Sequence, residues 1–158
     1  MSEEKKRVWA WFGVMILKNG KVLLGQRHED PKKASSLMHG ESTWTMPGGK
    51  MEFHETFEDM VYRETLEETW LKINKNKLKF ISITNDIVHD NHFVTIGFLC
   101  EDFSGEPKVM EPDEITKRER FDLNNLPKPL YFPSEKVLKN YLQWVIYRTE
   151  KSEGDLEI

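Results

Sequence analysis

Acidic side chains crowd a short segment of this chain, residues 63–68, whose sequence is RETLEE. On a helix, Glu64 and Glu68 lie one turn apart on the same side. That side also carries four apolar residues, which are Phe57, Met60, Val61 and Leu71. Two ionised carboxylates on an apolar face are costly because they lose hydration and repel each other. A bound divalent cation removes both costs, so the spacing favours a metal site.

The alternative interpretation is an ordinary solvated helix face, which is what most runs of helix charges are. It suits Glu58, Asp59 and Arg63. It suits Glu64 and Glu68 less well, because Phe57 and Val61 on the same side would then be solvated with them. The pattern alone therefore favours metal binding and leaves the solvated face open.

The stretch from residue 49 to residue 71 resembles the Nudix box, written G-x5-E-x7-R-E-U-x-E-E-x-G-U, where U is aliphatic. The residues that match are Gly49, Glu55, Arg63, Glu64, Glu67, Glu68 and Leu71. Thr65 stands at the first aliphatic position, and Trp70 replaces the second glycine. Residues 23–27, 44–49 and 121–127 also resemble the segments that flank the box in this family. We therefore interpret residues 1–158 as one Nudix domain, with residues 1–6 and 151–158 expected to be flexible.

The resemblance implies an α+β fold, an α/β/α sandwich with a mixed β-sheet and a catalytic loop-helix-loop. It also implies a site for Mg²⁺, with Mn²⁺ as the alternative ion, and carboxylate oxygens suit both. The implied metal ligands are Glu64, Glu67, Glu68 and the backbone carbonyl of Gly48. Arg63 and Glu55 are expected to hold these groups in place, and Gly49 belongs to the structural part of the box.

Other site residues are assigned with stated alternatives. Glu64 is the first candidate for the catalytic general base or for positioning the attacking water, because its apolar surroundings would raise its pKa. Arg27 is a candidate phosphate contact and equally fits a plain arginine at a strand end. Glu114 is chosen over Glu111 as a further metal ligand, although an ordinary solvated acidic loop explains both.

The family cleaves nucleoside diphosphates linked to a further group X. The residues that mark the ADP-ribose and diadenosine polyphosphate subgroups are absent. Ile87, Val88 and His89 occupy the positions where those marker residues would stand. By elimination the chain resembles MutT-like nucleoside triphosphate pyrophosphatases, which release a nucleoside monophosphate and pyrophosphate. Candidates for the base-binding slot come from their positions in the resemblance, and each also fits core packing: Phe93, Thr95, Tyr131 and Phe132.

Several other functions stay open. Within the enzyme class they are hydrolysis of a nucleotide sugar, ADP-ribose, capped RNA or another nucleoside diphosphate-X. A nucleotide-sensing module without catalysis is less favoured, because such modules usually lack some of the box glutamates that are present here. A partner-binding protein that uses Tyr62, Leu66 and Trp70 leaves Glu64 and Glu68 unexplained.

Local patterns indicate the elements that position these residues. Residues 8–17 and 22–24 predict a hairpin with an Asn19-Gly20 turn. Residues 28–42 predict a long loop beside the box, and Thr56 with Asp59 predicts a capping box that opens the central helix. Strands are predicted at 79–88, 92–101 and 117–122, with a turn at residues 90–91. A final helix is predicted with Ser134 as its N-cap, and its apolar stripe comprises Val137, Leu138, Tyr141, Leu142, Val145 and Ile146.

The end of the central helix departs from the family pattern. A glycine there would end the helix in a left-handed conformation, which is costly for Trp70. We therefore expect the helix to continue past Thr69 or the exit loop to differ. Tyr62, Leu66 and Trp70 form a second apolar stripe, which predicts that the helix is covered on both sides.

Composition excludes several classes of protein. The net charge of −4 disfavours a nucleic-acid surface. The single cysteine, Cys100, rules out an internal disulfide and suits a reducing compartment. No stretch approaches the ~18 apolar residues of a membrane span, and the polar start lacks a signal-peptide core. We expect a soluble cytoplasmic protein that acts on a small-molecule nucleotide, and the resemblance implies a homodimer.

Overall fold

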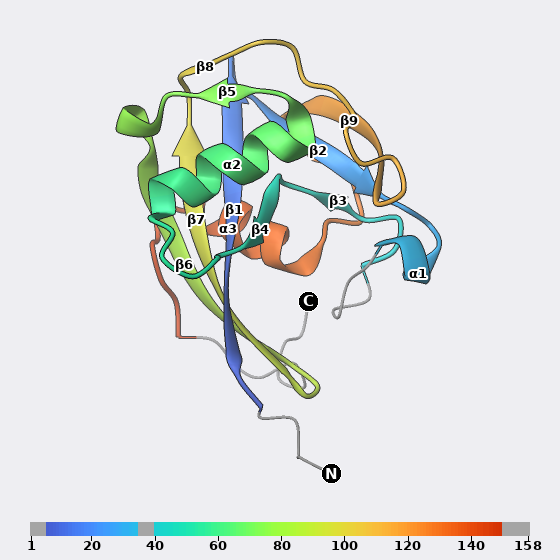
Figure 1. Cartoon of the computed structure of the whole chain (residues 1–158), viewed down its shortest axis with the longest axis vertical. Helices are drawn as coiled ribbons and strands as arrows, with labels where there is room; N and C mark the ends of the chain where they lie inside the picture. The colour runs from blue at the N-terminus through green and yellow to red at the C-terminus, as the bar shows by residue number, and fades with distance from the viewer. Residues whose placement is uncertain (1–5, 35–39, 150–158) are drawn as a thin grey trace.

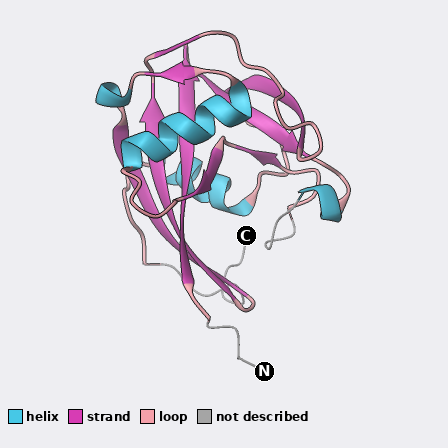
Figure 2. Ribbon diagram, in the orientation of Figure 1, coloured by secondary structure: helices cyan, strands magenta, loops and turns pink. Residues whose placement is uncertain are grey.

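The structure, a computed structural model, describes residues 6–34 and 40–149. Residues 35–39 of the predicted loop and most of the two ends for which we expected flexibility lie outside the described residues. Within the described part, seven strands form a mixed sheet (Figures 1 and 2). Its main path has the order β3-β2-β1-β7-β6, which are Trp44–Thr45, Lys21–Arg27, Val8–Lys18, Asn91–Cys100 and Lys79–Val88. The short β4 (Gly48–Lys50) pairs with β1, and β9 (Ile115–Asp122) pairs with β2.

One helix covers each face of this sheet. Helix α2 (Phe57–Thr69) lies on one face and α3 (Phe132–Leu142) on the other (Figure 1). Strands β1 and β7 are parallel, whereas the other strand pairs are antiparallel. The arrangement confirms the predicted α+β fold with a mixed sheet between helices.

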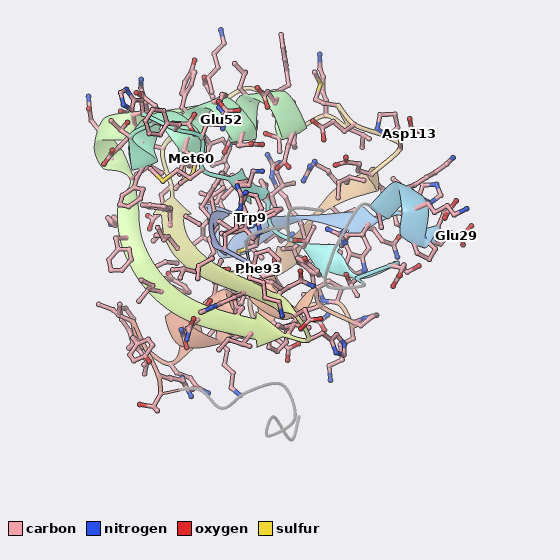
Figure 3. All side chains as sticks on the ribbon, turned by 60° about the horizontal axis from the view of Figure 1, so that its bottom comes forward. Trp9, Glu29, Glu52, Met60, Phe93 and Asp113 are labelled. Carbon is pink, nitrogen blue, oxygen red and sulfur yellow. The ribbon has the colours of Figure 1, made fainter. Side chains whose placement is uncertain are left out.

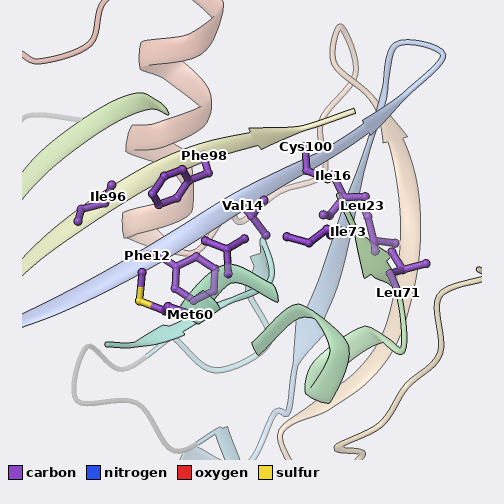
Figure 4. Packing of buried hydrophobic residues seen from close by; sticks show 11 residues of the cluster. Phe12, Val14, Ile16, Leu23, Met60, Leu71, Ile73, Ile96, Phe98 and Cys100 are labelled. Atoms are coloured by element: carbon purple, nitrogen blue, oxygen red, sulfur yellow. The ribbon is translucent and has the colours of Figure 1, made fainter. Parts of the chain in front are cut away.

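Strand alternation divides the apolar residues into two cores. On the α2 side, Phe12, Val14 and Ile16 of β1 pack with Met60 and other residues (Figure 4). The α3 side holds a second core, whose members are Met15, Val22, Leu24, Trp44, Met46, Leu99, Val137 and Leu138. Successive residues of β1 point to opposite faces, so one strand contributes to both layers. Burial on both faces explains why β1 and β7 read as continuous apolar runs.

The hairpin and the helix cap follow the predicted local chemistry. Asn19 and Gly20 take positive φ angles of 53° and 76°, as the tight turn between β1 and β2 requires. The backbone amide of Asp59 donates to Thr56 Oγ1 at 3.1 Å, which confirms Thr56 as the N-cap of α2.

Small elements complete the fold. Two-residue strands β5 (Lys72–Ile73) and β8 (Phe103–Ser104) pair beyond the end of α2, and the 3₁₀ helix η1 is Lys75–Lys77. The predicted loop 28–42 contains a four-residue helix, α1 (Pro31–Ala34). Pro31 stands at its first position, where the missing N–H has no helical partner to lose.

Helix α2 differs from its predicted course at both ends. Phe57 is 44% exposed although its ring centroid lies 6.1 Å from that of the core residue Phe98, so it lies at the edge of the core and not within it. The helix ends at Thr69, and Trp70 takes the left-handed conformation at φ 68° while its N–H donates to Leu66 O. The expectation that the helix continues was wrong. Trp70 is 48% exposed, so the second apolar stripe is not fully covered, although Tyr62 packs against the core.

Two predicted boundaries also move. The β6–β7 turn falls at residues 89–90, one residue earlier than predicted, with His89 at φ 52°. Tyr131, not Ser134, is the N-cap of α3, and Ser134 Oγ instead accepts a hydrogen bond from Met46 N at 3.0 Å. The helix ends at Leu142, so the last part of the predicted stripe lies beyond it. No helix in residues 6–34 and 40–149 is long and apolar enough to span a membrane.

Candidate active site

A cavity of about 670 Å³ gathers residues from both sides of the sheet. Among its lining residues are predicted site residues from widely separated parts of the chain: Arg27, Gly48, Gly49, Glu64, Glu68, Phe93, Thr95, Glu114 and Tyr131. Arg63, Glu67, Glu55 and Phe132 do not line it. The ring of Phe132, at the start of α3, instead lies 4.9 Å from Lys136 Nζ.

Arg63 connects the glutamates of α2 to the loop before it. Its Nε and Nη2 donate to the two carboxylate oxygens of Glu55 at 2.6 and 3.0 Å. Its Nη1 donates to Glu64 Oε1 at 2.9 Å and to Glu67 Oε2 at 3.5 Å. A planar guanidinium can hold three carboxylates in this way, whereas a lysine ammonium does not present the same planar set of donors. Arg63 therefore orients Glu64 from outside the cavity.

Glu68 is partly buried, and it is the acid of α2 whose pKa burial raises most. Its Oε2 accepts a hydrogen bond from the backbone N–H of Gly48 at 3.0 Å. Burial raises the pKa of Glu68 to about 8, although the nearby charge of Arg118 and this hydrogen bond act in the opposite direction. Burial also raises the pKa of Glu64, against the hydrogen bond from Arg63. Both carboxylates thus lie in partly desolvated surroundings.

Two adjacent glycines of β4 allow close approaches, Gly49 to α2 and Gly48 to β1. A Cβ atom on Gly49 would lie 2.5 Å from Glu64 Cδ, and one on Gly48 would lie 2.2 Å from the Phe12 carbonyl oxygen. Real Cβ contacts are not that short, so a side chain at either position would displace its neighbour. Glycine here allows the backbone of β4 to lie directly against the acids of α2.

Two further acids reach the cavity from the loop before β9. Glu111 and Glu114 both line it, so the choice of Glu114 over Glu111 made from the sequence is not a distinction in position. Burial raises the pKa of Glu111, and the nearby charge of Glu114 acts in the same direction. The amide of Glu114 donates to the Glu111 carbonyl at 3.0 Å, which fixes the turn.

These acids fit a hard divalent cation by their chemistry. Their oxygens are the donors that Mg²⁺ and Mn²⁺ prefer, and their mutual repulsion is what a cation relieves. In the described part of the chain, no three acidic, histidine or cysteine side chains already converge as a ligand set. Arg63 binds Glu64 and Glu67 in this structure. Ligation therefore requires those carboxylates to turn from the arginine toward the ion.

Arg27 is fixed at the wall of the cavity. Its guanidinium stacks on Tyr131, 4.5 Å from the ring centroid, and its Nη2 donates to the Ala34 carbonyl of α1. Its Nε is buried and has no hydrogen-bond partner among residues 6–34 and 40–149. The positive charge is thus held beside the acids with one donor left over.

Two further aromatic residues also line the cavity. Trp11 of β1 and Phe93 of β7 meet edge to face, with centroids 5.7 Å apart. Figure 3 shows Phe93 on β7 near Trp9 on β1, its partner in the parallel register. Thr95 lies two residues along β7 and donates its hydroxyl to Asp86 Oδ2 at 2.8 Å. The buried Asp86 also forms an ion pair with Lys136, so this ion pair connects β6 to α3.

Sequence reasoning missed several lining residues, notably Trp11, Thr45, Arg118 and Ser134. Thr45 Oγ1 and Ser134 Oγ lie 2.9 Å apart although they are 89 positions apart in the chain. Such a pair has no local signal. Arg118 stands in a strand of charged residues, and only the pairing with Gly25 of β2 shows which face it occupies.

Comparison with known proteins agrees with the geometry. A family model described as the NUDIX domain matches residues 6–141. The chain is 36% identical over 130 residues to an ADP-ribose pyrophosphatase of Methanocaldococcus jannaschii, covering 82% of this chain and 70% of that protein. It is 32% identical over 120 residues to an oxidized purine nucleoside triphosphate hydrolase of Danio rerio, covering 72% and 66%. A solved MutT NUDIX hydrolase from Burkholderia pseudomallei superimposes with a TM-score of 0.74 at 29% identity, covering 85% of this chain and 98% of that one.

Proposed function

The chain belongs to the Nudix family of pyrophosphohydrolases, and from this premise we propose that it hydrolyses nucleoside triphosphates in the presence of Mg²⁺. The products are the nucleoside monophosphate and pyrophosphate. The observation that carries this proposal is the mixed lining of one cavity, which contains carboxylates and arginines together with the aromatic pair Trp11 and Phe93. A nucleotide has the matching halves, an anionic phosphate chain and a flat apolar base.

Each residue of the acidic part has a proposed task. Glu64, Glu67, Glu68, Glu114 and the Gly48 carbonyl would hold the metal. A bound Mg²⁺ or Mn²⁺ would supply Lewis-acid chemistry, polarising a phosphoryl oxygen and lowering the pKa of a water. Glu64 accepts the proton of the attacking water, because its raised pKa brings it closer to neutrality than an exposed glutamate.

The surrounding residues bind and orient. Arg63 holds Glu64 and Glu67 by hydrogen bonds from outside the cavity, and Arg27 contacts a phosphate oxygen through its unpartnered Nε. Phe93 and Trp11 stack on the base. Tyr131 supports Arg27 from behind the guanidinium.

A second candidate substrate is ADP-ribose. Its support is the 36% identity to the archaeal ADP-ribose pyrophosphatase. Against it stands Ile87, at a place where the ADP-ribose subgroup is associated with proline. The triphosphate is preferred because the Danio rerio relative and the Burkholderia structure both carry names of the triphosphate-cleaving branch. The homodimer implied by the resemblance stays a prediction, which light scattering of the purified protein tests.

Product analysis separates the two substrates. The protein is incubated with Mg²⁺ and single substrates: nucleoside and deoxynucleoside triphosphates, ADP-ribose, nucleotide sugars and dinucleoside polyphosphates. The proposal predicts a nucleoside monophosphate and pyrophosphate from one or a few triphosphates. Preferential conversion of ADP-ribose to AMP and ribose phosphate would replace the triphosphate with the second candidate.

A further inference from the structure

Arg118 of β9 occupies a slot made by a glycine on the neighbouring strand. Figure 1 shows β9 alongside β2, and in their register Arg118 is the partner of Gly25. A Cβ atom on Gly25 would lie 2.9 Å from Arg118 Nη1 and 2.8 Å from Ile115 Cγ2. Because Gly25 has no side chain, the guanidinium lies against β2 at the wall of the cavity.

The guanidinium has donors to spare. Arg118 Nε and Nη1 are both buried and find no hydrogen-bond partner in the described part of the chain. Arg63 is the contrast, because its donors are taken up by Glu55, Glu64 and Glu67. An unpaired buried donor is destabilising, and more so on a charged group. A protein that keeps two of them at a cavity wall has a place for an anionic ligand.

The neighbouring acids do not satisfy Arg118. Glu68 and Glu111 are close enough for their charges to act on it. Glu68 Oε2, however, accepts from Gly48 N, and neither acid makes a hydrogen bond or ion pair with Arg118 among the described residues. Both acids also face the part of the cavity that we assign to metal binding. The donors of Arg118 therefore remain available to another group of oxygens.

Arg27 stands in the same cavity with its own buried, unpartnered Nε. Together the two arginines leave three donors at one cavity wall, which suits a ligand with several anionic oxygens. We propose that Arg118 binds a phosphate group of the substrate, as a second phosphate-binding cation beside Arg27. This proposal rests on the proposed function, since it names a contact to the phosphate chain of the same substrate.

The test measures binding of inorganic pyrophosphate, without any turnover. Isothermal titration calorimetry in Mg²⁺ compares the wild-type protein with Arg118→Gln and Arg118→Lys. The control is Arg120→Gln, two residues further along β9, where the arginine pairs with Glu106 at 3.9 Å and does not line the cavity. Thermal unfolding of each variant checks that it folds.

We expect Arg118→Gln to weaken pyrophosphate binding by about tenfold or more, because charge-assisted hydrogen bonds to a desolvated anion are lost. Arg118→Lys keeps the positive charge but loses the paired donors of the guanidinium. Its affinity for pyrophosphate should therefore lie between that of the wild type and that of Arg118→Gln. Arg120→Gln should bind like the wild type. If Arg118→Gln does not fold, wild-type binding in Arg118→Lys is the result that overturns the proposal.

Other outcomes separate this proposal from the proposed function. Unchanged pyrophosphate binding in folded Arg118→Gln overturns it and leaves the arginine as a counter-ion for the acids. Failure of the wild-type protein to bind pyrophosphate overturns it as well. Arg118-dependent binding of pyrophosphate together with no hydrolysis of any triphosphate supports the phosphate contact and contradicts the proposed reaction.

Discussion

Glu68 is the residue at which burial and charge oppose each other most strongly. The pKa of its carboxyl rises from 4.5 to about 8, mainly because the group is desolvated. In the metal-free folded protein it therefore holds a proton near neutral pH, whereas in the unfolded chain it is ionised. A proton or a metal ion can relieve the same cost.

This difference predicts how stability depends on pH without metal. Below about pH 4.5 the carboxyl is protonated in both states and contributes no penalty. As the pH rises toward about 8, the unfolded state gains stability by ionising, so the free energy of unfolding falls. Glu68→Gln removes this titration. Urea unfolding in EDTA between pH 5 and pH 8 should show a loss larger in the wild type by on the order of 2–4 kcal/mol.

Parallel pH curves for the wild type and Glu68→Gln would show that Glu68 ionises normally in the folded protein. Glu64 and Glu111 also have raised pKa values, because both are buried. Ionisation of Glu64 and Glu111 lowers the free energy of unfolding as the pH rises in both proteins. The difference between the two pH curves therefore reports on Glu68. The matched control is Glu58→Gln on the exposed side of α2, whose curve should follow the wild type.

Arg63 acts through other residues, and its replacement should reveal that. In Arg63→Lys a single ammonium replaces the guanidinium, which holds Glu55 with two hydrogen bonds and Glu64 with a third. We expect kcat to fall by about 100-fold, because misplacement of a catalytic group by about 1 Å has that effect. KM should change little, since Arg63 does not line the cavity. Steady-state kinetics beside Arg120→Lys measures both, and a wild-type kcat would remove Arg63 from the mechanism.

The backbone of strand β4 meets the acidic side chains of α2, where Gly49 leaves room for Glu64 and the Gly48 N–H donates to Glu68. The end of α2 shows a second backbone requirement, since Trp70 takes a left-handed conformation that favours glycine. The Trp70 N–H still donates to Leu66 O, and Thr69 Oγ1 accepts from Leu71 N at 3.2 Å. These bonds keep the exit turn although its residue is unusual. The contact between elements therefore depends on backbone geometry as much as on side-chain packing.

Gly49→Ala tests the contact between β4 and α2. The added Cβ would lie 2.5 Å from Glu64 Cδ, so the carboxylate must move. We expect kcat to fall by about 100-fold with a smaller change in stability. Gly97→Ala is the comparison, because its Cβ would meet Val137 Cγ1 of α3 at 2.7 Å and lies away from the acids. It should lower the free energy of unfolding by about 1–3 kcal/mol through overpacking.

Steady-state kinetics and urea unfolding of Gly49→Ala and Gly97→Ala test whether the position of Glu64 affects activity separately from stability. Equal losses of activity in the two variants would show that any disturbance of the fold inactivates the protein. Retained activity in Gly49→Ala would show that the position of Glu64 is not critical.

At the scale of the whole molecule, the sheet separates two kinds of chemistry. Glu64 and Glu68 come from α2 on one face, whereas Ser134 and Val137 come from α3 on the other. All four side chains line one cavity. The fold thus brings side chains from helices on both faces of the sheet to a single cavity.

Local sequence predicted what local forces determine. The Asn19-Gly20 turn and the Thr56 cap depend on neighbouring residues and could be recognised directly. The acids of α2 could be recognised because polar groups on an apolar face need an explanation. The position of Ser134, by contrast, depends on a hydrogen bond to Met46, and such long-range contacts have no sequence period.

Arg118 shows the same limit within the site. The sequence predicted only a strand at residues 117–122, and the place of Arg118 in the cavity depends on the β2–β9 register and on Gly25. The exposed Phe57 shows the reverse error, since a helical period cannot tell where the covering sheet ends. Periodicity predicts which residues share a face but not how far the neighbouring layer extends.

The central claim is that the buried acids of α2 make this protein a metal-dependent pyrophosphohydrolase. The most direct measurement is the rate of pyrophosphate release from a panel of nucleoside triphosphates by the wild type and by Glu68→Gln, each with Mg²⁺ and with EDTA. Our account predicts release by the wild type in Mg²⁺ only, and a rate lower by at least about 100-fold in folded Glu68→Gln. Equal rates in the two proteins, or equal rates with Mg²⁺ and EDTA, would contradict it.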